Sequence, residues 1–247
     1  MPSCFSSQSL ALLRGLRENN SRLWYKDRHQ EIERELLAPA RELVLDVGQI
    51  LAPLFPGLVA DPRTDRSVFR LNRDTRFSRD KSPYKDWLAL IWFLDTDFGR
   101  LESPCFYFHL TGYSFLWSVG CYRFSQPALE RWPQFLADPE KGPRLAKIIE
   151  DYDARDLIIN EPFLKRLPAG ADKNDPLAKY LRYRGLYVLS NPKKPDLQLF
   201  TPEASQYIAN LLLSGRELLE WLTDLYKGLA LPPRLEPKRG RGRPRGS

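Results

Sequence analysis

The spacing of the apolar residues changes in the middle of the chain, and this change sets the class of fold. Segments near both ends repeat apolar residues every three or four positions, as amphipathic helices do. Between them, aromatic-rich runs are bounded by Gly, Pro, Asp and Ser, which is typical of β-strands. Gly99 and Gly112 fall where hairpin turns are needed. The pattern therefore predicts a curved antiparallel sheet with strands at 87–94, 105–110 and 114–122.

Within the second run, the alternation of side chains assigns residues to opposite faces of the sheet. Because successive strand residues point to opposite sides, Cys105, Tyr107 and His109 share one face. Phe106 and Phe108 lie on the other face, together with Leu110. The large aromatic residues of the three runs are predicted to form the core; they are Trp87, Trp92, Phe106, Phe108, Phe115 and Trp117.

The flanking segments give the rest of the expected architecture. A short helix starts at Ser7 or Ser9, and helical spacing over 22–51 is bent or split by Pro39. Helices are expected at 127–136, 143–152 and 201–227, and short strands at 68–71 and 185–189. The sequence thus predicts one α+β domain, residues 1–231, with N- and C-terminal helices packed on the sheet. A disordered basic tail, 232–247, is expected to follow it.

Composition and cysteine content indicate the class of protein and the compartment in which it is expected. The chain has 247 residues, with 43% hydrophobic and 28% charged, close to globular averages, so fibrous and fully disordered classes are excluded. The longest apolar run, 87–94, is too short to span a bilayer, and the N-terminal residues do not resemble a secretion signal. Three widely spaced cysteines suit a reducing compartment. We expect a cytoplasmic protein without a membrane partner, a metal or a cofactor.

The densest polar stretch covers residues 69–85. Three arginines occur three positions apart, and guanidinium groups that converge bind phosphates and carboxylates well. Two lysines would add point charges, and a tyrosine would add a hydroxyl donor and a stacking face. The candidate anion-binding residues are Arg70, Arg73, Arg76, Lys81, Tyr84 and Lys85.

Two interpretations of this stretch stay open. Asp74 and Asp80 are close enough in sequence to orient the arginines, so an ion-pair network that ties down a loop is one. The other is a pocket for a phosphorylated or nucleotide ligand, in which Asp74, Asp80 and His109 are candidate catalytic acids or bases. A buried histidine in a strand is more often a hydrogen-bonded core residue than a base. Convergence of these side chains in an open pocket would favour the second interpretation.

The residues of this stretch, together with two other parts of the chain, resemble those of a known protein family. The chain resembles the conserved hypothetical family called domain of unknown function 2461, over about residues 5–226. The resemblance implies a single α+β domain with no agreed activity. Three strings support it: Phe5…Leu13-Arg14-Gly15-Leu16…Asn19-Asn20…Trp24-Tyr25, Phe69-Arg70…Arg73-Asp74…Arg76-Phe77-Ser78…Asp80-Lys81…Pro83-Tyr84-Lys85, and Tyr107-Phe108-His109-Leu110.

The C-terminal segment suggests a separate activity. Residues 234–247 hold six basic residues and one acid out of a chain whose net charge is +7, so most of the excess positive charge lies there. The string resembles an AT-hook, in which Gly242 lets the backbone approach the minor-groove floor and Pro244 keeps the chain extended. A generic basic tail is the alternative. The candidate DNA-binding residues are Lys238, Arg239, Arg241, Gly242, Arg243, Pro244 and Arg245.

Three hypotheses for function follow from the sequence. The first is a cytoplasmic or nucleoid-associated protein that its tail tethers to AT-rich double-stranded DNA. The second is an enzyme that acts on a phosphorylated or nucleotide ligand bound by the 70–85 stretch. The third is a non-enzymatic interaction domain in which that stretch is a structural ion-pair network.

Overall fold

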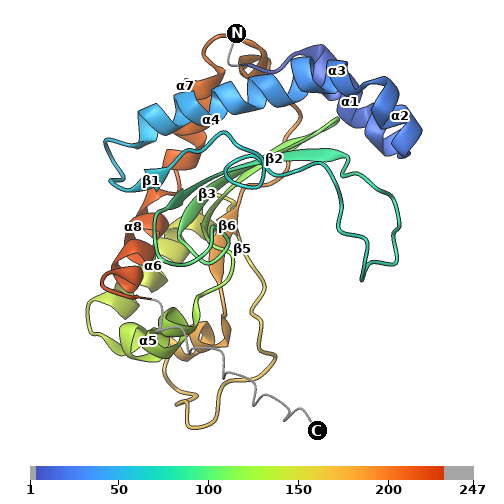
Figure 1. Ribbon diagram of the computed structural model, residues 1–247. Helices are drawn as coiled ribbons and strands as arrows, with labels where there is room; N and C mark the ends of the chain where they lie inside the picture. Colours follow the sequence, from blue (N-terminus) through green and yellow to red (C-terminus); the bar gives the residue numbers. More distant parts are fainter. Residues whose placement is uncertain (1–3, 231–247) are drawn as a thin grey trace, which may run out of the picture.

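A six-stranded sheet lies at the centre of the computed structural model, which describes residues 4–230 (Figure 1). The strand order is β1-β2-β3-β4-β6-β5, and every neighbouring pair is antiparallel. The predicted α+β class is therefore confirmed. The strands are β1 (Leu58–Val59), β2 (Trp87–Leu94), β3 (Cys105–Thr111), β4 (Phe115–Cys121), β5 (Ile158–Ile159) and β6 (Leu186–Leu189).

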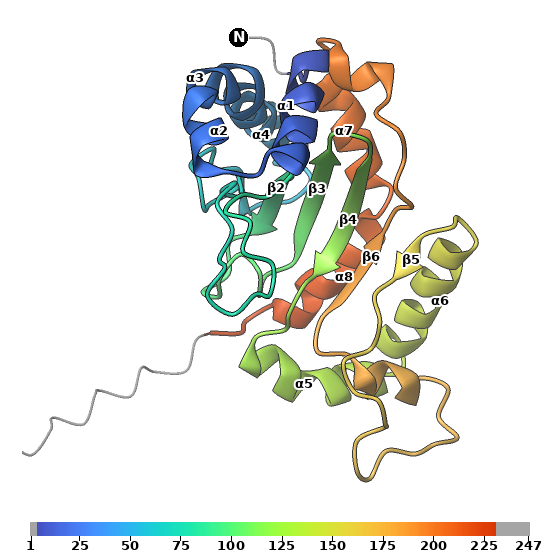
Figure 2. The ribbon, with the colours of Figure 1, turned by 90° about the vertical axis from the view of Figure 1, so that its right-hand side faces the viewer.

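Helices from both ends of the chain pack on one face of this sheet. Helix α4 contacts β2, α1 contacts β3, and α7 and α8 contact β4. Helices α5 and α6 pack against α8 near the other end of the sheet (Figures 1 and 2). The helices are α1 (Ser7–Glu18), α2 (Arg22–Asp27), α3 (His29–Ile32), α4 (Ala38–Leu51), α5 (Gln126–Ala137), α6 (Lys141–Asp153), α7 (Ala204–Leu213) and α8 (Arg216–Tyr226), with short helical turns η1 (Glu33–Leu37), η2 (Ala178–Arg182) and η3 (Leu197–Phe200).

The segment 22–51, predicted as a helix that Pro39 bends or splits, is divided into several pieces. It breaks at Arg28, and a π-helical turn, η1, precedes α4. Pro39 explains the π-helical turn, because it has no N–H to donate to the carbonyl of Glu35 one turn earlier. The hydroxyl of Ser9 in α1 donates to that carbonyl instead, at 2.5 Å. The carbonyl that Pro39 leaves without its usual helical donor thus forms a hydrogen bond that links α1 to η1.

The predicted C-terminal helix, 201–227, is also divided, into α7 and α8 with a break at Ser214 and Gly215. The break lies where the helical layer meets the sheet. A Cβ atom at Gly215 would lie 2.8 Å from a methyl group of Val119 in β4. Only glycine therefore allows the backbone to pass this close to the strand.

The main core lies between the helical layer and one face of the sheet. It includes the even-numbered residues of β2 and β3, such as Trp92, Phe106 and Phe108, all fully buried. The indole Nε1 of Trp92 donates to the carbonyl oxygen of Val44 in α4 at 2.9 Å, which fixes this helix on the sheet. Across residues 4–230, no helix is both long and apolar enough to cross a membrane.

Candidate ligand-binding site on the open face of the sheet

Among residues 4–230, no helix covers the second face of β3, β4 and β6 (Figure 2). The odd-numbered residues of β2 and β3 point to this face. Trp87, Tyr107 and His109 are accordingly half-buried, whereas their even-numbered neighbours Leu88, Phe108 and Leu110 are fully buried. The predicted division of 105–110 between two faces is confirmed. Trp87, which was predicted as core, lies instead on the open face.

A cavity of about 420 Å³ lies on this open face. Its floor is a row of paired residues, Ile91, Tyr107, Ser118 and Leu189, which are neighbours across β2, β3, β4 and β6. Aromatic side chains supply most of its walls. They are Phe69, Trp87, Tyr107, Tyr122 and Tyr187.

A glycine lets β6 approach β4 closely under this cavity. Gly120 pairs with Tyr187 and has a φ of 145°, which disfavours any residue with a Cβ atom. A Cβ atom there would lie 2.4 Å from the Cα of Tyr187. The close approach brings the Tyr187 ring to the cavity wall beside Tyr122, with 5.9 Å between the ring centroids.

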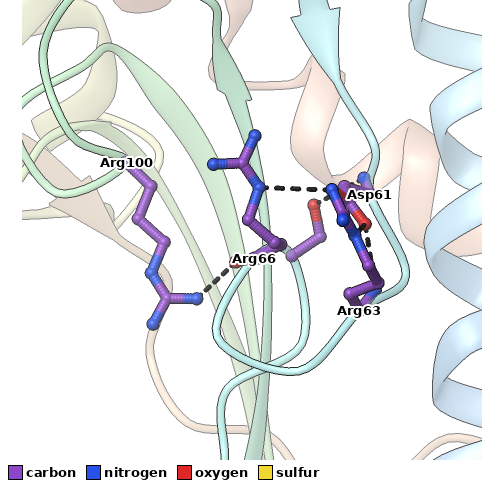
Figure 3. Close-up of polar contacts among 5 residues, drawn as sticks. Asp61, Arg63, Arg66 and Arg100 are labelled. Carbon is purple, nitrogen blue, oxygen red and sulfur yellow. Dashed lines mark hydrogen bonds and ion pairs between the residues drawn. The ribbon is translucent and has the colours of Figure 1, made fainter.

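One wall of the cavity depends on a loop that Asp61 holds together. The Asp61 carboxylate accepts hydrogen bonds from the guanidinium of Arg63, the shortest at 2.5 Å, and from Nε of Arg66 at 3.2 Å (Figure 3). These bonds, those from Arg63 above all, hold the pKa of Asp61 far below its usual range, so the carboxylate stays ionised. Ser67 closes the loop, because its N–H donates to the Asp61 carbonyl at 2.9 Å.

This loop places the Phe69 side chain at the cavity wall. The carbonyl of Ser67 accepts from the N–H of Ile91 and the N–H of Phe69 donates to Ala89, so the segment pairs along the edge of β2. The predicted strand 68–71 is reduced to this pairing and an isolated bridge between Val68 and Leu90. Arg100 secures the segment, because its guanidinium donates to the Arg66 carbonyl (Figure 3). The same guanidinium lies 4.2 Å from the centroid of the Phe69 ring.

Two cations lie against the aromatic wall. The ammonium of Lys85 is 4.6 Å from the Trp87 ring centroid and 5.6 Å from that of Phe69. Burial, and next the charge of Arg70, lower the pKa of Lys85, while Asp65 opposes the shift. Burial likewise lowers the pKa of Arg100, which stays charged because a guanidinium titrates so high. Positive charge therefore lies against Phe69 and Trp87, two residues of the cavity wall, although neither cation lines the cavity itself.

A tyrosine and a histidine share a hydrogen bond on the same face. The Tyr107 hydroxyl lies 3.0 Å from Nδ1 of His109, and the His109 ring lies 4.8 Å from that of Trp87. Burial raises the pKa of Tyr107, so its hydroxyl keeps the proton. Burial also lowers the pKa of His109, partly offset by Asp86, which favours a neutral imidazole. A neutral ring that accepts at Nδ1 from Tyr107 carries its proton on Nε2.

The residues predicted from the 69–85 stretch fall into three groups. In the first, Arg73 pairs with Asp80 and Arg76 pairs with Asp74, within an exposed loop. The hydrogen bond from Arg76 lowers the pKa of Asp74 to about 2, and hydrogen bonds from Ser82 lower that of Asp80. Among the described residues, neither carboxylate makes a hydrogen bond or ion pair with His109. The geometry in this part of the loop is that of an ion-pair network.

Lys81 also belongs to the first group, because it bonds within the loop, whereas Tyr84 forms the second group. The ammonium of Lys81 donates to the carbonyl of Thr75 at 2.8 Å. The second group is Tyr84 alone, which is buried in the main core and stacks on Tyr25 with 4.1 Å between ring centroids. The side chain of Asn20 bonds to both backbone groups of Tyr84, which anchors the end of the loop to the N-terminal helices.

The third group lies beside the cavity. Lys85 is at the aromatic wall, and Arg70 is close enough to influence its pKa. His109 is on the open face next to the cavity residue Tyr107. Sequence reasoning did not single out Trp87, Tyr107, Tyr122, Tyr187 or Arg100 as site residues. The available signal was that the alternation within the strands places aromatic residues on both faces of the sheet.

Two further predictions concern metals and the tail. Across residues 4–230, no group of three or more His, Cys, Asp or Glu side chains is arranged to hold a metal ion. The three cysteines of this part of the chain are free thiols. The predicted DNA-binding residues, 238–245, lie outside the described residues.

Comparison of the chain with known proteins identifies one matching family. A family model described as conserved hypothetical protein (DUF2461) matches residues 8–221. The match covers all the strands and the residues that form the open-face cavity. A search of the curated proteins finds no match to the chain.

Proposed function

Because the chain belongs to the conserved hypothetical protein family DUF2461, a description that assigns no activity, we propose a function from the geometry of the open face. We infer that this face binds a small ligand with a planar, apolar part and an anionic group, the chemistry of a nucleotide. The observation that carries the proposal is the 420 Å³ cavity with aromatic walls, together with the cations of Lys85 and Arg100 that lie against its wall residue Phe69. Cavities of this size commonly hold small ligands.

Each part of such a ligand has a partner at the cavity. The rings of Trp87 and Tyr107 offer apolar surface for a planar group, and stacking on aromatic rings is favourable for any base. Lys85 and Arg100 would neutralise a phosphate at the edge, where a charge-assisted hydrogen bond is strongest because the site is partly desolvated. The neutral imidazole of His109 adds a polar group on the same face. The proposal is one of binding, and it assigns no catalytic step.

Two lysines of the same loop give a matched test. Replacing Lys85 by Gln should weaken binding of deoxyadenosine monophosphate about tenfold or more, because a hydrogen bond between charged groups is lost. Lys81→Gln should leave the affinity at the wild-type value, since Lys81 bonds to Thr75, whereas Lys85 lies against the cavity residues Trp87 and Phe69. Isothermal titration calorimetry of full-length proteins measures both. Deoxyadenosine and inorganic phosphate, offered separately, should each bind more weakly than the nucleotide.

The outcomes separate the alternatives for the 69–85 stretch. Equal losses from Lys85→Gln and Lys81→Gln would place the anion at the exposed loop rather than at the cavity. Absence of nucleotide binding by the wild-type protein would contradict the proposal altogether.

We propose a second, independent function for the C-terminal segment: tethering to AT-rich double-stranded DNA. The supporting observation is in the sequence, where Arg241-Gly242-Arg243-Pro244 stands within a strongly basic stretch. Flat guanidinium groups fit a narrow minor groove, where the negative potential is strongest. A G·C pair places an exocyclic amine in that groove, so A·T pairs should be preferred.

A charge-conserving substitution tests the tether. Arg243→Lys should lower selectivity for A·T over G·C duplexes more than it lowers overall affinity, because the compact ammonium keeps the charge and loses the planar shape. Gly242→Ala should have the same effect, since a methyl group would lift the backbone from the groove floor. Fluorescence anisotropy with both duplexes measures the two affinities. A generic basic tail would give equal affinities for A·T and G·C duplexes with the wild-type protein.

A further inference from the structure

A second cavity adjoins the first, and the two share a wall. This cavity has a volume of about 650 Å³ and lies at the end of β4, between that strand and the loop that follows β5. Tyr122 and Tyr187 line both cavities. The two cavities therefore adjoin at the tyrosine pair. We refer to them together as the groove; its lining residues extend from Trp87 in the first cavity to Phe163 in the second.

Aromatic side chains along this groove are exposed in a way that the fold does not require. The side chain of Tyr122 is 61% exposed, although it directly follows a buried strand. Phe163, which lines the second cavity, is 71% exposed. Large apolar side chains that stay in water along one groove mark an interaction site better than they serve stability.

Positive charge accompanies the rings at both ends of the groove. The guanidinium of Arg184 lies 5.4 Å from the centroid of the Phe163 ring, just as Lys85 and Arg100 lie against Phe69 at the other end. Arg123 also lines the second cavity, and it pairs with Glu102 at 2.6 Å. Glu161 is the other acidic side chain of this wall. Each aromatic wall thus has a cation beside it.

We propose that this groove binds single-stranded nucleic acid, with one base at Trp87 and Tyr107 and the following bases at Tyr122 and Phe163. The inference extends the proposed function, because its first subsite is the nucleotide cavity. Alternating stacking surfaces and cations are what an unpaired strand requires, since every base has a π-face and every linkage a negative charge. An open antiparallel sheet presents its aromatic residues to unstacked bases without obstruction.

The test uses the full-length chain, and it separates stacking from simple charge attraction. A deoxyadenylate hexamer should bind at least tenfold more tightly than a hexamer of the same length that has no bases. The basic C-terminal segment attracts both oligomers through their phosphates, so it contributes equally to the two affinities. Fluorescence anisotropy with both oligomers, unlabelled and in competition, gives the ratio.

Substitutions at the second cavity locate the additional subsites. Tyr122→Ala and Phe163→Ala should each reduce affinity for the deoxyadenylate hexamer by about 5- to 150-fold, the range for loss of one stacked base. Affinity for deoxyadenosine monophosphate should not change in Phe163→Ala, because Phe163 lines only the second cavity, whereas Tyr122 lines both. Phe77→Ala is the matched control: Phe77 is 95% exposed and has the Arg76 guanidinium 5.8 Å from its ring centroid, yet it lines neither cavity. Thermal melting of the variants confirms folding, which these exposed side chains should not affect.

Three results would overturn the inference. The two hexamers could bind equally, the Tyr122 and Phe163 variants could keep the wild-type affinity, or Phe77→Ala could cause the same loss as Phe163→Ala. Tighter binding of a heparin hexasaccharide, lost in the same variants, would assign the groove to acidic polysaccharides instead. If the mononucleotide binds in a Lys85-dependent manner and the hexamer binds no tighter, the proposed function stands while this inference fails. If neither ligand binds, both fail.

Discussion

Deleting residues 234–247 should remove most of the protein's affinity for AT-rich duplex DNA and leave its melting temperature unchanged. The deleted segment holds six basic residues, so under the proposed tether it should supply the phosphate contacts that dominate affinity for a duplex. The described core and its hydrogen bonds involve residues 4–230, and none of them is removed. For the full-length chain, the logarithm of the affinity should fall with the logarithm of the salt concentration at a slope of about −4, if about four or five phosphates are neutralised.

The same truncation also separates the two proposed activities. Base-dependent binding of the deoxyadenylate hexamer should persist in the truncated protein, because the open-face groove is intact. Electrophoretic mobility shift assays with the duplex and differential scanning fluorimetry provide the measurements. A truncated protein that binds the A·T duplex as well as the intact one does would contradict the tether.

The second large effect is expected in the core. Trp92→Ala should lower the free energy of unfolding by about 3–5 kcal/mol, the usual cost of emptying a fully buried aromatic site. Trp92 is fully buried between β2 and α4, and its indole N–H is bonded to the Val44 carbonyl. The substitution therefore removes both packing volume and a bond between the two layers. Since domains are typically stable by only about 5–15 kcal/mol, this loss should shift the urea midpoint strongly.

Another tryptophan of the same strand is the control. Trp87 lies on the open face and is half-buried, so Trp87→Ala should cost about 1 kcal/mol of stability, which is the average for point substitutions. It should nevertheless weaken nucleotide binding, because the ring is part of the cavity wall. Urea denaturation and calorimetric titration of both variants test this contrast. A larger loss of stability from Trp87→Ala than from Trp92→Ala would show that the roles of the two faces have been assigned wrongly.

The sequence predicted the longer elements because they have a clear periodicity. The alternation in 105–110 gave both the strand and the division of its faces, and helical spacing located α5 and α6 to within two residues. The π-helical turn before α4 was not predictable in this way. It depends on Ser9, a residue distant in sequence that supplies the hydrogen bond that Pro39 cannot. Similarly, β1 and β5 have two residues each, too few to show any period.

The candidate site was predictable only in part, for a related reason. Lys81 and Lys85 belong to the same basic stretch and cannot be distinguished by composition. The fold separates them, because Asn20 holds the backbone of Tyr84 and so places Lys85 against Trp87. The aromatic walls come from five separate segments that meet only in three dimensions, which no local pattern reveals. The strand alternation indicated that some aromatic residues face away from the core, without showing that helices leave that face uncovered.

The two short edge strands have a consequence for solubility. A sheet edge with a long row of unpaired backbone groups is a template for a strand from another molecule, and such pairing leads to aggregation. Here β1 and β5 end the sheet with two residues each, and the segment 67–69 occupies part of the remaining edge of β2. Within the described residues, an apolar, aromatic sheet face is therefore exposed while the two edges of the sheet offer only short unpaired segments to another copy of the chain.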